Sequence, residues 1–384
     1  MQYPLTDDQL RVQELARQFA DREVAPHADA NSRAERYPVE LVQRAAELGF
    51  CGVLVPKEYG GKAWGNFALT LILEEVNRAC ASTGVTLSVH NSLVSNPVRQ
   101  FGSEWLKQKY LPALACGERI GAYCLTEPHS GSDAAALSTS AIRDGDTFIL
   151  TGTKFFITTG SDAGLYVVFA RTDAAHKTRG ITAFVIEREA PGLVVGKHEA
   201  KLGLRASHTT EILLQECRVP LSNVLGQVGE GFKIAMQTLD GGRVGIATQS
   251  VGIAQACVDA AARFALEHTQ FGQPLATFQA VQNRIASMAT EVEASRLLTY
   301  NAARLRDLGE PHSQESAMAK LFSAQACNRI AREAVQICGV DGLRRGADVE
   351  RYLRDARVTE LYEGTTEIQK LVIGRAVLKK YSES

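Results

Sequence analysis

The residue whose type and position first suggest chemistry is Glu363, in the stretch RVTELYEGTTEIQK near the C-terminus. Residues 351–361 keep a helical period, Gly364 is a typical helix stop, and Thr366 with Gln369 predicts a capping box that opens a new helix. Glu363 is therefore expected in a tight break between two helices. Two interpretations are open at this point: a surface glutamate favoured by the helix dipole, and a carboxylate held in place for a reaction.

A second stretch, CLTEPHSGSDAAA, is rich in residues that can surround a polar ring or a phosphate. Around Thr126, Ser130, Gly131 and Ser132, small side chains allow backbone N–H groups to approach a ligand closely. The alternative is a loop that only connects two domains. The GQVGEG segment at 226–231 could also cradle a phosphate, but its spacing fits no phosphate loop, and the turn chemistry favours a linker.

Other motifs that carry chemistry are missing from the sequence. No G-x-G-x-x-G follows a predicted strand and no P-loop pattern occurs, so neither of these nucleotide-binding folds is indicated. The eight histidines are scattered, without a pair at ligand spacing, and we expect no metal site. Arg351, Arg354 and Arg357 recur every third residue, which is typical of a solvated or salt-bridged helix face.

Composition excludes several classes of protein. The 42 basic and 43 acidic residues leave a formal net charge of -1 without a basic stripe, which argues against nucleic acid as a partner. Eight scattered cysteines without a C-x-x-C motif suit reduced thiols in a cytosol-like compartment. We find no apolar run of membrane-spanning length and no signal peptide, so we expect no membrane insertion. The expected location is the cytoplasm, as in bacteria, or the mitochondrial matrix if a transit peptide was removed.

The elements that must position these residues follow a simple order. A helical period dominates residues 1–120, and short β-branched or aromatic runs such as TFILTGTKFFITTG fill residues 121–230. Long Ala-rich helical segments then fill residues 231–384. The pattern predicts an α+β fold with an N-terminal α-helical domain of five or six helices, a middle antiparallel β domain that forms a small barrel, and a C-terminal α-helical domain.

Seven motifs, in order along nearly the whole chain, resemble the acyl-CoA dehydrogenase family. They are LVPKEYGG, CLTEPHSGSD, TGTKFFITTG, KLGLRASHTTEI, GEGFKIAM, FGQPLATFQAVQ and VERYLRDARVTELYEGTTEIQ. SVHNSLV, LDGGRVGIA and ESAMAKL look most similar to short-chain (butyryl-type) or short branched-chain members. The resemblance implies an acyl-CoA dehydrogenase-like fold with a C-terminal four-helix bundle, a homotetramer, and one FAD per subunit.

The resemblance also implies a reaction. In this family a carboxylate removes the α-proton of an acyl-CoA thioester while the β-hydrogen leaves as hydride to flavin N5, and electrons pass on to an electron-transferring flavoprotein. The similarity puts Glu363 in the place of this general base. Some members carry the base one residue before an arginine on the first helix of the bundle, where this chain has Gly242 before Arg243. Glu363 is then the only candidate.

The similarity further implies binding residues. Within one subunit, the FAD contacts would be Tyr123, Leu125, Thr126, Gly131, Ser132, Phe156, Ile157 and Thr158, with Thr365 and Glu367 beside the base. From neighbouring subunits, the contacts would be His268, Phe271, Gln279, Gln336, Gly339 and Val340. The acyl-CoA contacts would be Ser132, Asp240, Arg243, Tyr362 and Gly364.

Five positions depart from the family pattern. Phe156 stands where tryptophan is common, His129 replaces a frequent glycine, and His268 replaces an arginine that usually meets the FAD diphosphate. Val340 replaces a glycine and Leu343 an aromatic residue. These departures suggest one alternative function, a flavin-poor scaffold protein. Because fold does not fix function, an oxidase or monooxygenase that uses oxygen on the same fold is also considered.

Overall fold

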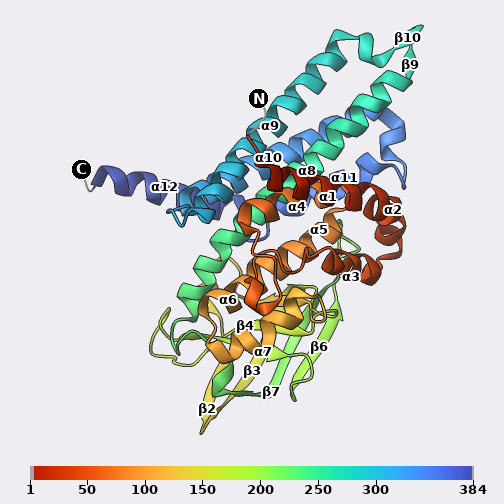
Figure 1. The fold of residues 1–384 in the computed structure, drawn as a ribbon. Helices are drawn as coiled ribbons and strands as arrows, with labels where there is room; N and C mark the ends of the chain where they lie inside the picture. Colours follow the sequence, from red (N-terminus) through yellow and green to blue (C-terminus); the bar gives the residue numbers. More distant parts are fainter. Residues whose placement is uncertain (1–3, 383–384) are drawn as a thin grey trace.

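The computed structural model describes residues 4–382. Figure 1 shows three parts: the N-terminal helices lie between a β-sheet at the bottom and long C-terminal helices at the top. The predicted order of helices, strands and helices is confirmed.

The N-terminal part consists of α-helices, two π-helical turns (η1 and η3) and one 3-10 turn (η2). They are α1 (Asp7–Phe19), η1 (Ala20–Val24), α2 (Ala25–Ala34), α3 (Val39–Glu47), η2 (Lys57–Tyr59), α4 (Gly65–Ala79), α5 (Ala81–Ser88), η3 (Val89–Ser95), α6 (Asn96–Phe101) and α7 (Glu104–Ala115). Within the described residues these are seven α-helices, more than the five or six expected. No loop separates α5, η3 and α6, so the sequence offers no break there by which to count them separately. The first helix begins at a capping box between Thr6 and Gln9, as predicted.

The middle part is one eight-stranded sheet. Its elements are β1 (Gly121–Cys124), η4 (Ala134–Ala136), β2 (Ser140–Asp144), β3 (Thr147–Thr158), β4 (Leu165–Arg171), β5 (Ile181–Glu187), β6 (Leu193–His198), β7 (Thr209–Pro220), η5 (Leu221–Asn223) and β8 (Val224–Leu225). The strand order is β6-β7-β3-β2-β4-β5-β8, and β1 pairs with β4. Most pairs are antiparallel, but β1 and β2 each meet β4 in parallel, and no recorded pair joins β6 to β8. The sheet is therefore mixed, and no closed barrel is seen.

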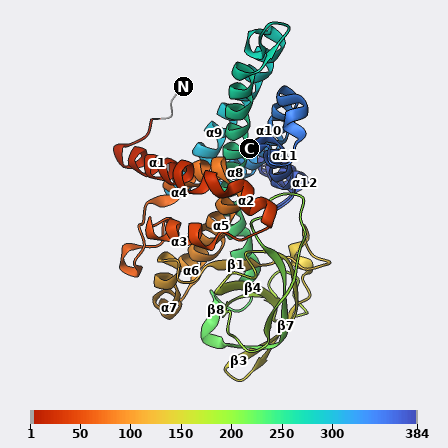
Figure 2. The ribbon, with the colours of Figure 1, turned by 90° about the vertical axis from the view of Figure 1, so that its right-hand side faces the viewer.

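The C-terminal part is again helical. Its elements are α8 (Gly231–Glu267), β9 (Thr269–Gln270), β10 (Gln273–Pro274), η6 (Leu275–Thr277), α9 (Gln279–Asp307), α10 (Ser313–Cys338), η7 (Gly339–Leu343), α11 (Asp348–Ala356), η8 (Arg357–Glu360) and α12 (Thr366–Ser382). The small β9–β10 hairpin lies at the far tip of α8 and α9, and α12 runs out to the C-terminus away from them (Figure 1). In the turned view, the sheet again lies at the opposite end from this tip (Figure 2).

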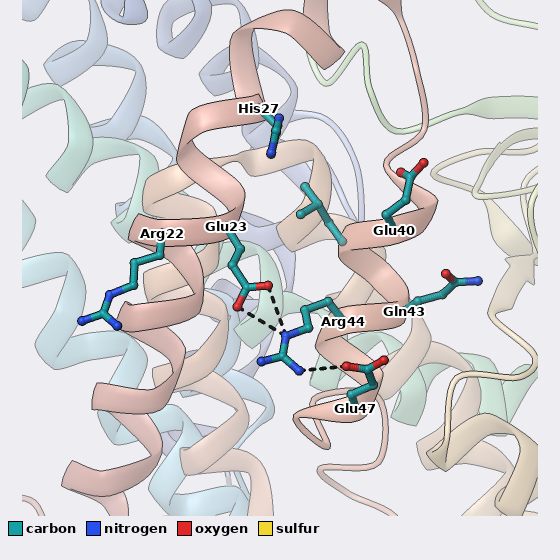
Figure 3. A pocket seen from close by; sticks show the side chains of 8 residues that line it. Arg22, Glu23, His27, Glu40, Gln43, Arg44 and Glu47 are labelled. Carbon is teal, nitrogen blue, oxygen red and sulfur yellow. Dashed lines mark hydrogen bonds and ion pairs between the residues drawn. The ribbon is translucent and has the colours of Figure 1, made fainter.

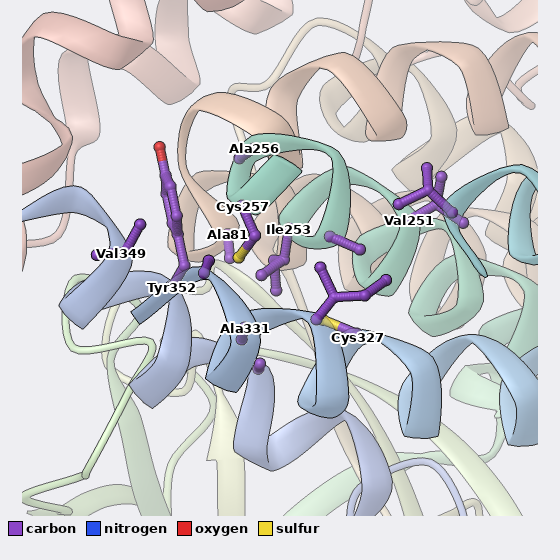
Figure 4. Packing of buried hydrophobic residues seen from close by; sticks show 14 of the residues in the cluster. Ala81, Val251, Ile253, Ala256, Cys257, Cys327, Ala331, Val349 and Tyr352 are labelled. Atoms are coloured by element: carbon purple, nitrogen blue, oxygen red, sulfur yellow. The ribbon is translucent and has the colours of Figure 1, made fainter. Parts of the chain in front are cut away.

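Two buried clusters fix the long helices. Small side chains such as Cys257 of α8 and Cys327 and Ala331 of α10 allow these helices to lie close together, with Tyr352 of α11 packed beside them (Figure 4). The second cluster joins Phe67 of α4 to α8, α9 and α10, so an N-terminal helix is packed into the C-terminal group.

Candidate active site

Glu363 lies in the break between η8 and α12 that the sequence predicts. Its φ is 51° and that of Gly364 is 93°, so two consecutive residues are left-handed. This conformation is ordinary for glycine but uncommon for glutamate, so the surrounding structure must stabilise the turn. The helical segment before it ends earlier than expected: α11 stops at Ala356 and a 3-10 turn continues to Glu360.

The capping box predicted at Thr366 is wrong. Helix α12 begins at Thr366, but the cap is Thr365, whose Oγ1 accepts a hydrogen bond from Ile368 N at 3.4 Å. The Gln369 side chain does not accept from the cap as a capping box requires. Its amide donates backwards instead, to Gly364 O at 2.9 Å and Glu363 O at 3.3 Å.

A second donor holds the same turn from another helix. Lys320, in the N-terminal third of α10, is fully buried, and its Nζ donates to Gly364 O at 2.7 Å. The carbonyl of Gly364 thus accepts from an ammonium group of α10 and an amide of α12. The left-handed turn that carries Glu363 is therefore anchored on both sides.

The Glu363 carboxylate points at α8. A β-carbon added to Gly242 would overlap Glu363 Oε2 and would come within 2.9 Å of Leu93 on η3. Glu363 Oε2 is buried and has no hydrogen-bond partner within the described chain. A buried oxygen without a partner is costly, so this atom is available to a ligand.

The surroundings of this carboxylate change its acidity. Burial raises the pKa of Glu363 to about 7, against the opposing positive charges of Lys320 and Arg243. Burial and then the Glu363 charge raise the pKa values of Tyr123 and Tyr362 well above their ordinary value, which places both phenols near the carboxylate. A carboxylate that exchanges its proton near neutral pH is suited to general base catalysis.

Arg243 and Asp240 form an ion pair on the same helix. Arg243 is buried, and its Nη1 donates to Asp240 Oδ1 at 2.5 Å. Burial lowers the pKa of Arg243, although Asp240 and Glu363 act in the opposite direction. Arg243 Nε is buried without a partner in the described residues, while Asp240 also accepts from Ser313 Oγ at 3.0 Å. The two predicted acyl-CoA contacts on α8 therefore lie together.

The loop after β1 is pinned to the end of β3. Phe155 N donates to Thr126 O at 2.8 Å, and the fully buried Lys154 pairs with Glu127 at 2.8 Å. Glu127 also accepts from Ser138 N at 2.6 Å and Thr139 N at 3.0 Å. The segments 123–132 and 156–158, which contain predicted FAD residues, are consequently held side by side and are called the predicted flavin surface.

This surface has an apolar and a polar side. Phe156 is 58% exposed and has a φ of 54°, so its ring is held outward. A β-carbon at Gly131 would meet open space, Ser132 is exposed, and the buried hydroxyl of Tyr123 has no partner in the described chain. Leu125 and Ile157 are buried beneath these residues, and Thr158 pairs with Thr209 in the sheet. These three residues therefore belong to the framework that holds the exposed ones. An exposed aromatic wall beside open backbone suits a planar ring with polar edges.

The residues predicted to bind FAD from neighbouring subunits lie elsewhere. His268 ends α8 and approaches Asp341 on η7 at 3.9 Å, and its ring stacks on Phe264. Phe271, at the hairpin tip, is 93% exposed, and Val340 and Leu343 are also exposed. The remaining members of this group are Gln279, Gln336 and Gly339. About 26 residues of helix, or roughly 40 Å, separate His268 from Gly242, so within one chain His268 lies far from the Glu363 carboxylate beside Gly242.

A hollow on the N-terminal helices is not part of this site. It is lined by Arg22, Glu23, His27, Glu40, Leu41, Gln43, Arg44 and Glu47 (Figure 3). Arg44 lies between Glu23 and Glu47, at 3.1 and 2.8 Å, so these carboxylates are already paired. No residue predicted for catalysis or binding lines this hollow.

Three further expectations concern metal ions, membrane spans and the arginine row. Residues 4–382 contain no group of three or more His, Cys, Asp or Glu side chains arranged to hold a metal ion. In the same range, no helix is both long enough and apolar enough to cross a membrane. The arginine row is salt-bridged as predicted: Arg351 pairs with Asp348 at 2.8 Å and Arg354 with Glu350 at 2.6 Å.

Sequence reasoning missed Lys320, Leu93 and the Glu127–Lys154 pair. Lys320 stands in the Ala-rich run SAMAKLFSAQA, where flanking Ser316, Ala317 and Ala319 are buried, so a lysine in register with a buried helix face was the available signal. Glu127 and Lys154 lie 27 residues apart in different elements, and no periodicity connects them.

Comparisons with known proteins agree with this architecture. Models of the N-terminal, middle and C-terminal domains of acyl-CoA dehydrogenase match residues 6–118, 122–217 and 229–378. The mitochondrial short-chain specific acyl-CoA dehydrogenase of Mus musculus is 46% identical over 381 residues, which are 99% of this chain and 92% of the mouse protein.

Solved structures give the same result. The butyryl-CoA dehydrogenase of Megasphaera elsdenii superposes with a TM-score of 0.97 at 40% identity, covering 98% of this chain and all of that one. A chain from a structural study of the electron transferring flavoprotein of Acidaminococcus fermentans gives a TM-score of 0.97 at 43% identity, with the same coverage. The fold and the three domain matches define an acyl-CoA dehydrogenase architecture. The chain belongs to the acyl-CoA dehydrogenase family.

Proposed function

We propose that this protein is an FAD-dependent enzyme that oxidises a short or branched acyl-CoA to its trans-2-enoyl-CoA, with Glu363 as the base that removes the α-proton. The observation that carries the proposal is the Glu363 carboxylate itself. It is held on an anchored turn, its Oε2 is buried without a partner in the described residues, and its pKa is raised to about 7 by burial.

The α-carbon of a thioester is a weak acid, so the base needs a fixed position and a matched proton affinity. Lys320 and Gln369 fix the turn, while Gly242 leaves space for the carboxylate against α8. The buried carboxylate takes the α-proton onto Oε2, and the burial that raises its pKa favours the protonated product. The backbone N–H of Glu363 is our candidate donor to the thioester carbonyl, where negative charge develops.

FAD, when bound, supplies the acceptor for the hydride that leaves the β-carbon. Phe156 would give the flavin ring an apolar wall, and the loop around Thr126, Gly131 and Ser132 would present backbone donors to its polar edge. Tyr123 completes the wall with a buried hydroxyl that has no partner in the described chain.

The packing behind Glu363 supports a short acyl chain. A β-carbon at Gly245 would overlap Ser88 Oγ, so α8 lies directly against α5 one turn beyond Gly242. On the same side, the buried Gln249 is hydrogen-bonded to the Tyr362 hydroxyl. A long acyl chain would have to displace these side chains, whereas a butyryl or branched group needs less space. The similarity to short-chain and butyryl-CoA dehydrogenases points the same way.

The distance between His268 and Glu363 within one chain supports an oligomer. Because about 26 residues of α8 separate His268 from Gly242, which lies beside Glu363, we infer that a neighbouring subunit brings its His268, Phe271 and Val340 to each FAD, as in a homotetramer. An electron-transferring flavoprotein is the proposed electron acceptor, in line with the Acidaminococcus similarity. The eight free cysteines, seven of them buried, suit a reducing cytoplasm or a mitochondrial matrix.

Turnover of butyryl-, isobutyryl-, hexanoyl- and palmitoyl-CoA by the purified protein, with a dye as electron acceptor, tests this proposal. We expect dye reduction with the short or branched substrates and little with palmitoyl-CoA. Peroxide formed in proportion to product in air would favour an oxidase instead. A colourless protein that does not bind added FAD would favour the scaffold interpretation.

A further inference from the structure

The function proposed above uses the hydrogen bond of Lys320, a fully buried lysine close to the candidate base, but does not explain its charge. Lys320 has no solvent-exposed surface, yet its Nζ has one recorded hydrogen bond, to the neutral carbonyl of Gly364 at 2.7 Å. No acidic group within the described residues forms an ion pair with it. Burying an ammonium group without a carboxylate in direct contact costs several kcal/mol unless nearby negative charge compensates.

The nearest source of that charge is the base. Burial lowers the pKa of Lys320 to about 8, and Glu363 is the largest influence in the opposite direction, ahead of Glu360. Conversely, Lys320 acts more strongly on Glu363 than Arg243 does. The two groups therefore stabilise each other's charged forms, although the hydrogen bond of Lys320 goes to the residue next to Glu363.

The other charged and titratable groups around Glu363 come from α8, β1 and the turn itself. Helix α8 contributes Arg243, whose charge is shared with Asp240, and β1 contributes the neutral phenol of Tyr123. The chain around the turn contributes Tyr362, Glu360 and Glu367, of which the two glutamates act on Lys320. Two cations therefore act on Glu363. Arg243 is paired with Asp240, whereas Lys320 has no ion-pair partner within the described chain.

We propose that Lys320 is a positioning residue for the base: its ammonium group holds the Glu363–Gly364 turn and supplies the positive charge that keeps the Glu363 carboxylate ionised near neutral pH. This inference rests on the proposed function only in assigning Glu363 as the base. In this proposal Lys320 acts through Glu363 and not by contact with substrate or cofactor. The charge and the hydrogen bond are separable, because Gln369 offers the same carbonyl a neutral donor.

Infrared spectroscopy of the purified holoprotein between pH 5 and 9 tests the charge directly. The carboxylate band of Glu363 is identified as the one absent from Glu363→Gln, and its midpoint is read in wild type, Lys320→Met and the matched control Gln369→Met. Removing the positive charge should raise the midpoint by about one pH unit in Lys320→Met. Gln369→Met removes a donor to the same carbonyl without removing a charge, so its midpoint should stay at the wild-type value.

Two further readings keep the result decisive. If Lys320→Met does not fold, Lys320→Gln retains a donor without the charge, and the same upward shift is expected. The acidic limb of the kcat/KM profile for butyryl-CoA should move with the infrared midpoint. An unchanged Glu363 midpoint in the folded Lys320 variant, or an equal shift in Gln369→Met, overturns the proposal. Absence of acyl-CoA oxidation in wild type, with the infrared shift present, would refute the proposed function but leave the role of Lys320 intact.

Discussion

The Glu363 carboxylate occupies the space where a side chain at Gly242 would be, because a β-carbon built on Gly242 overlaps Glu363 Oε2. The two residues are 121 positions apart in the sequence, on a turn and on a long helix. The carboxylate on the turn can take this position because α8 has a glycine, and no larger residue, at position 242. Side chains at these two positions would therefore point into the same volume.

Replacing this glycine should displace the Glu363 carboxylate. In Gly242→Ala, the added methyl group would push Glu363 away, and a shift of about 1 Å lowers turnover by about 100-fold. The melting temperature should also fall, because the buried methyl group overlaps Glu363 and crowds Leu93. Gly374→Ala on α12 is the matched control, since a β-carbon there meets open space. Equal activity in Gly242→Ala and wild type would show that the carboxylate does not work from this position.

The buried Glu363 carboxylate should make stability depend on pH. Burial raises the pKa of Glu363 to about 7, above its unfolded value, so the folded protein binds this proton more tightly. The stabilisation is present at low pH and is lost as pH rises towards 7, by up to about 3 kcal/mol. Glu363→Gln should therefore unfold at a higher temperature than wild type at pH 8 and at a similar temperature at pH 5. The same difference in melting temperature at both pH values would contradict a raised pKa.

The buried ion pair between Glu127 and Lys154, beside the predicted flavin surface, should be costly to break. In Lys154→Met, the Glu127 carboxylate stays buried without its cation, which should cost about 3–5 kcal/mol of stability. The double variant Lys154→Met with Glu127→Gln should recover part of this loss. Denaturant unfolding of the three proteins gives the comparison, and a single variant as stable as wild type would exclude a structural role for the pair.

This pair also predicts acid sensitivity. Burial alone would raise the pKa of Glu127, but the charge and hydrogen bond of Lys154 hold it down at about 2. Its stabilising contribution is therefore complete above the ordinary carboxyl pKa and is lost as pH falls towards 2. The stability difference between wild type and Lys154→Met should shrink below pH 4. A difference that stays constant down to pH 3 would mean that Glu127 is not held ionised by Lys154.

FAD affinity should increase when His268 is replaced by arginine. A guanidinium carries a permanent charge and offers a planar fork to phosphate, whereas His268 stacks on Phe264 with its Nε2 3.9 Å from Asp341. We expect His268→Arg to bind FAD about fivefold more tightly at pH 8, as one exposed contact allows. FAD dissociation constants of both proteins provide the test. Equal or weaker binding by His268→Arg would show that His268 only packs against Phe264.

Local signals predicted the break around Glu363 because Gly364 stops a helix whatever surrounds it. The cap of α12 was misplaced by one residue because Thr365 and Thr366 are both competent caps, and tertiary contacts decide between them. Lys320 and the overlap between Gly242 and Glu363 depend on how three helices cross, which no periodicity contains. The sheet closure expected for the β domain likewise depends on pairing between strands distant in sequence.

The account depends most on Glu363 as the base, and one measurement tests this directly. Wild type and Glu363→Gln, both loaded with FAD, are mixed with butyryl-CoA without oxygen, and the loss of flavin absorbance is followed. Because the amide keeps the shape of the side chain and cannot take the proton, we expect both proteins to bind butyryl-CoA. Flavin bleaching should be slower by several orders of magnitude in the variant. Bleaching faster than about a tenth of the wild-type rate, a loss below roughly 1.4 kcal/mol in transition-state stabilisation, would contradict the assignment of Glu363 as the base.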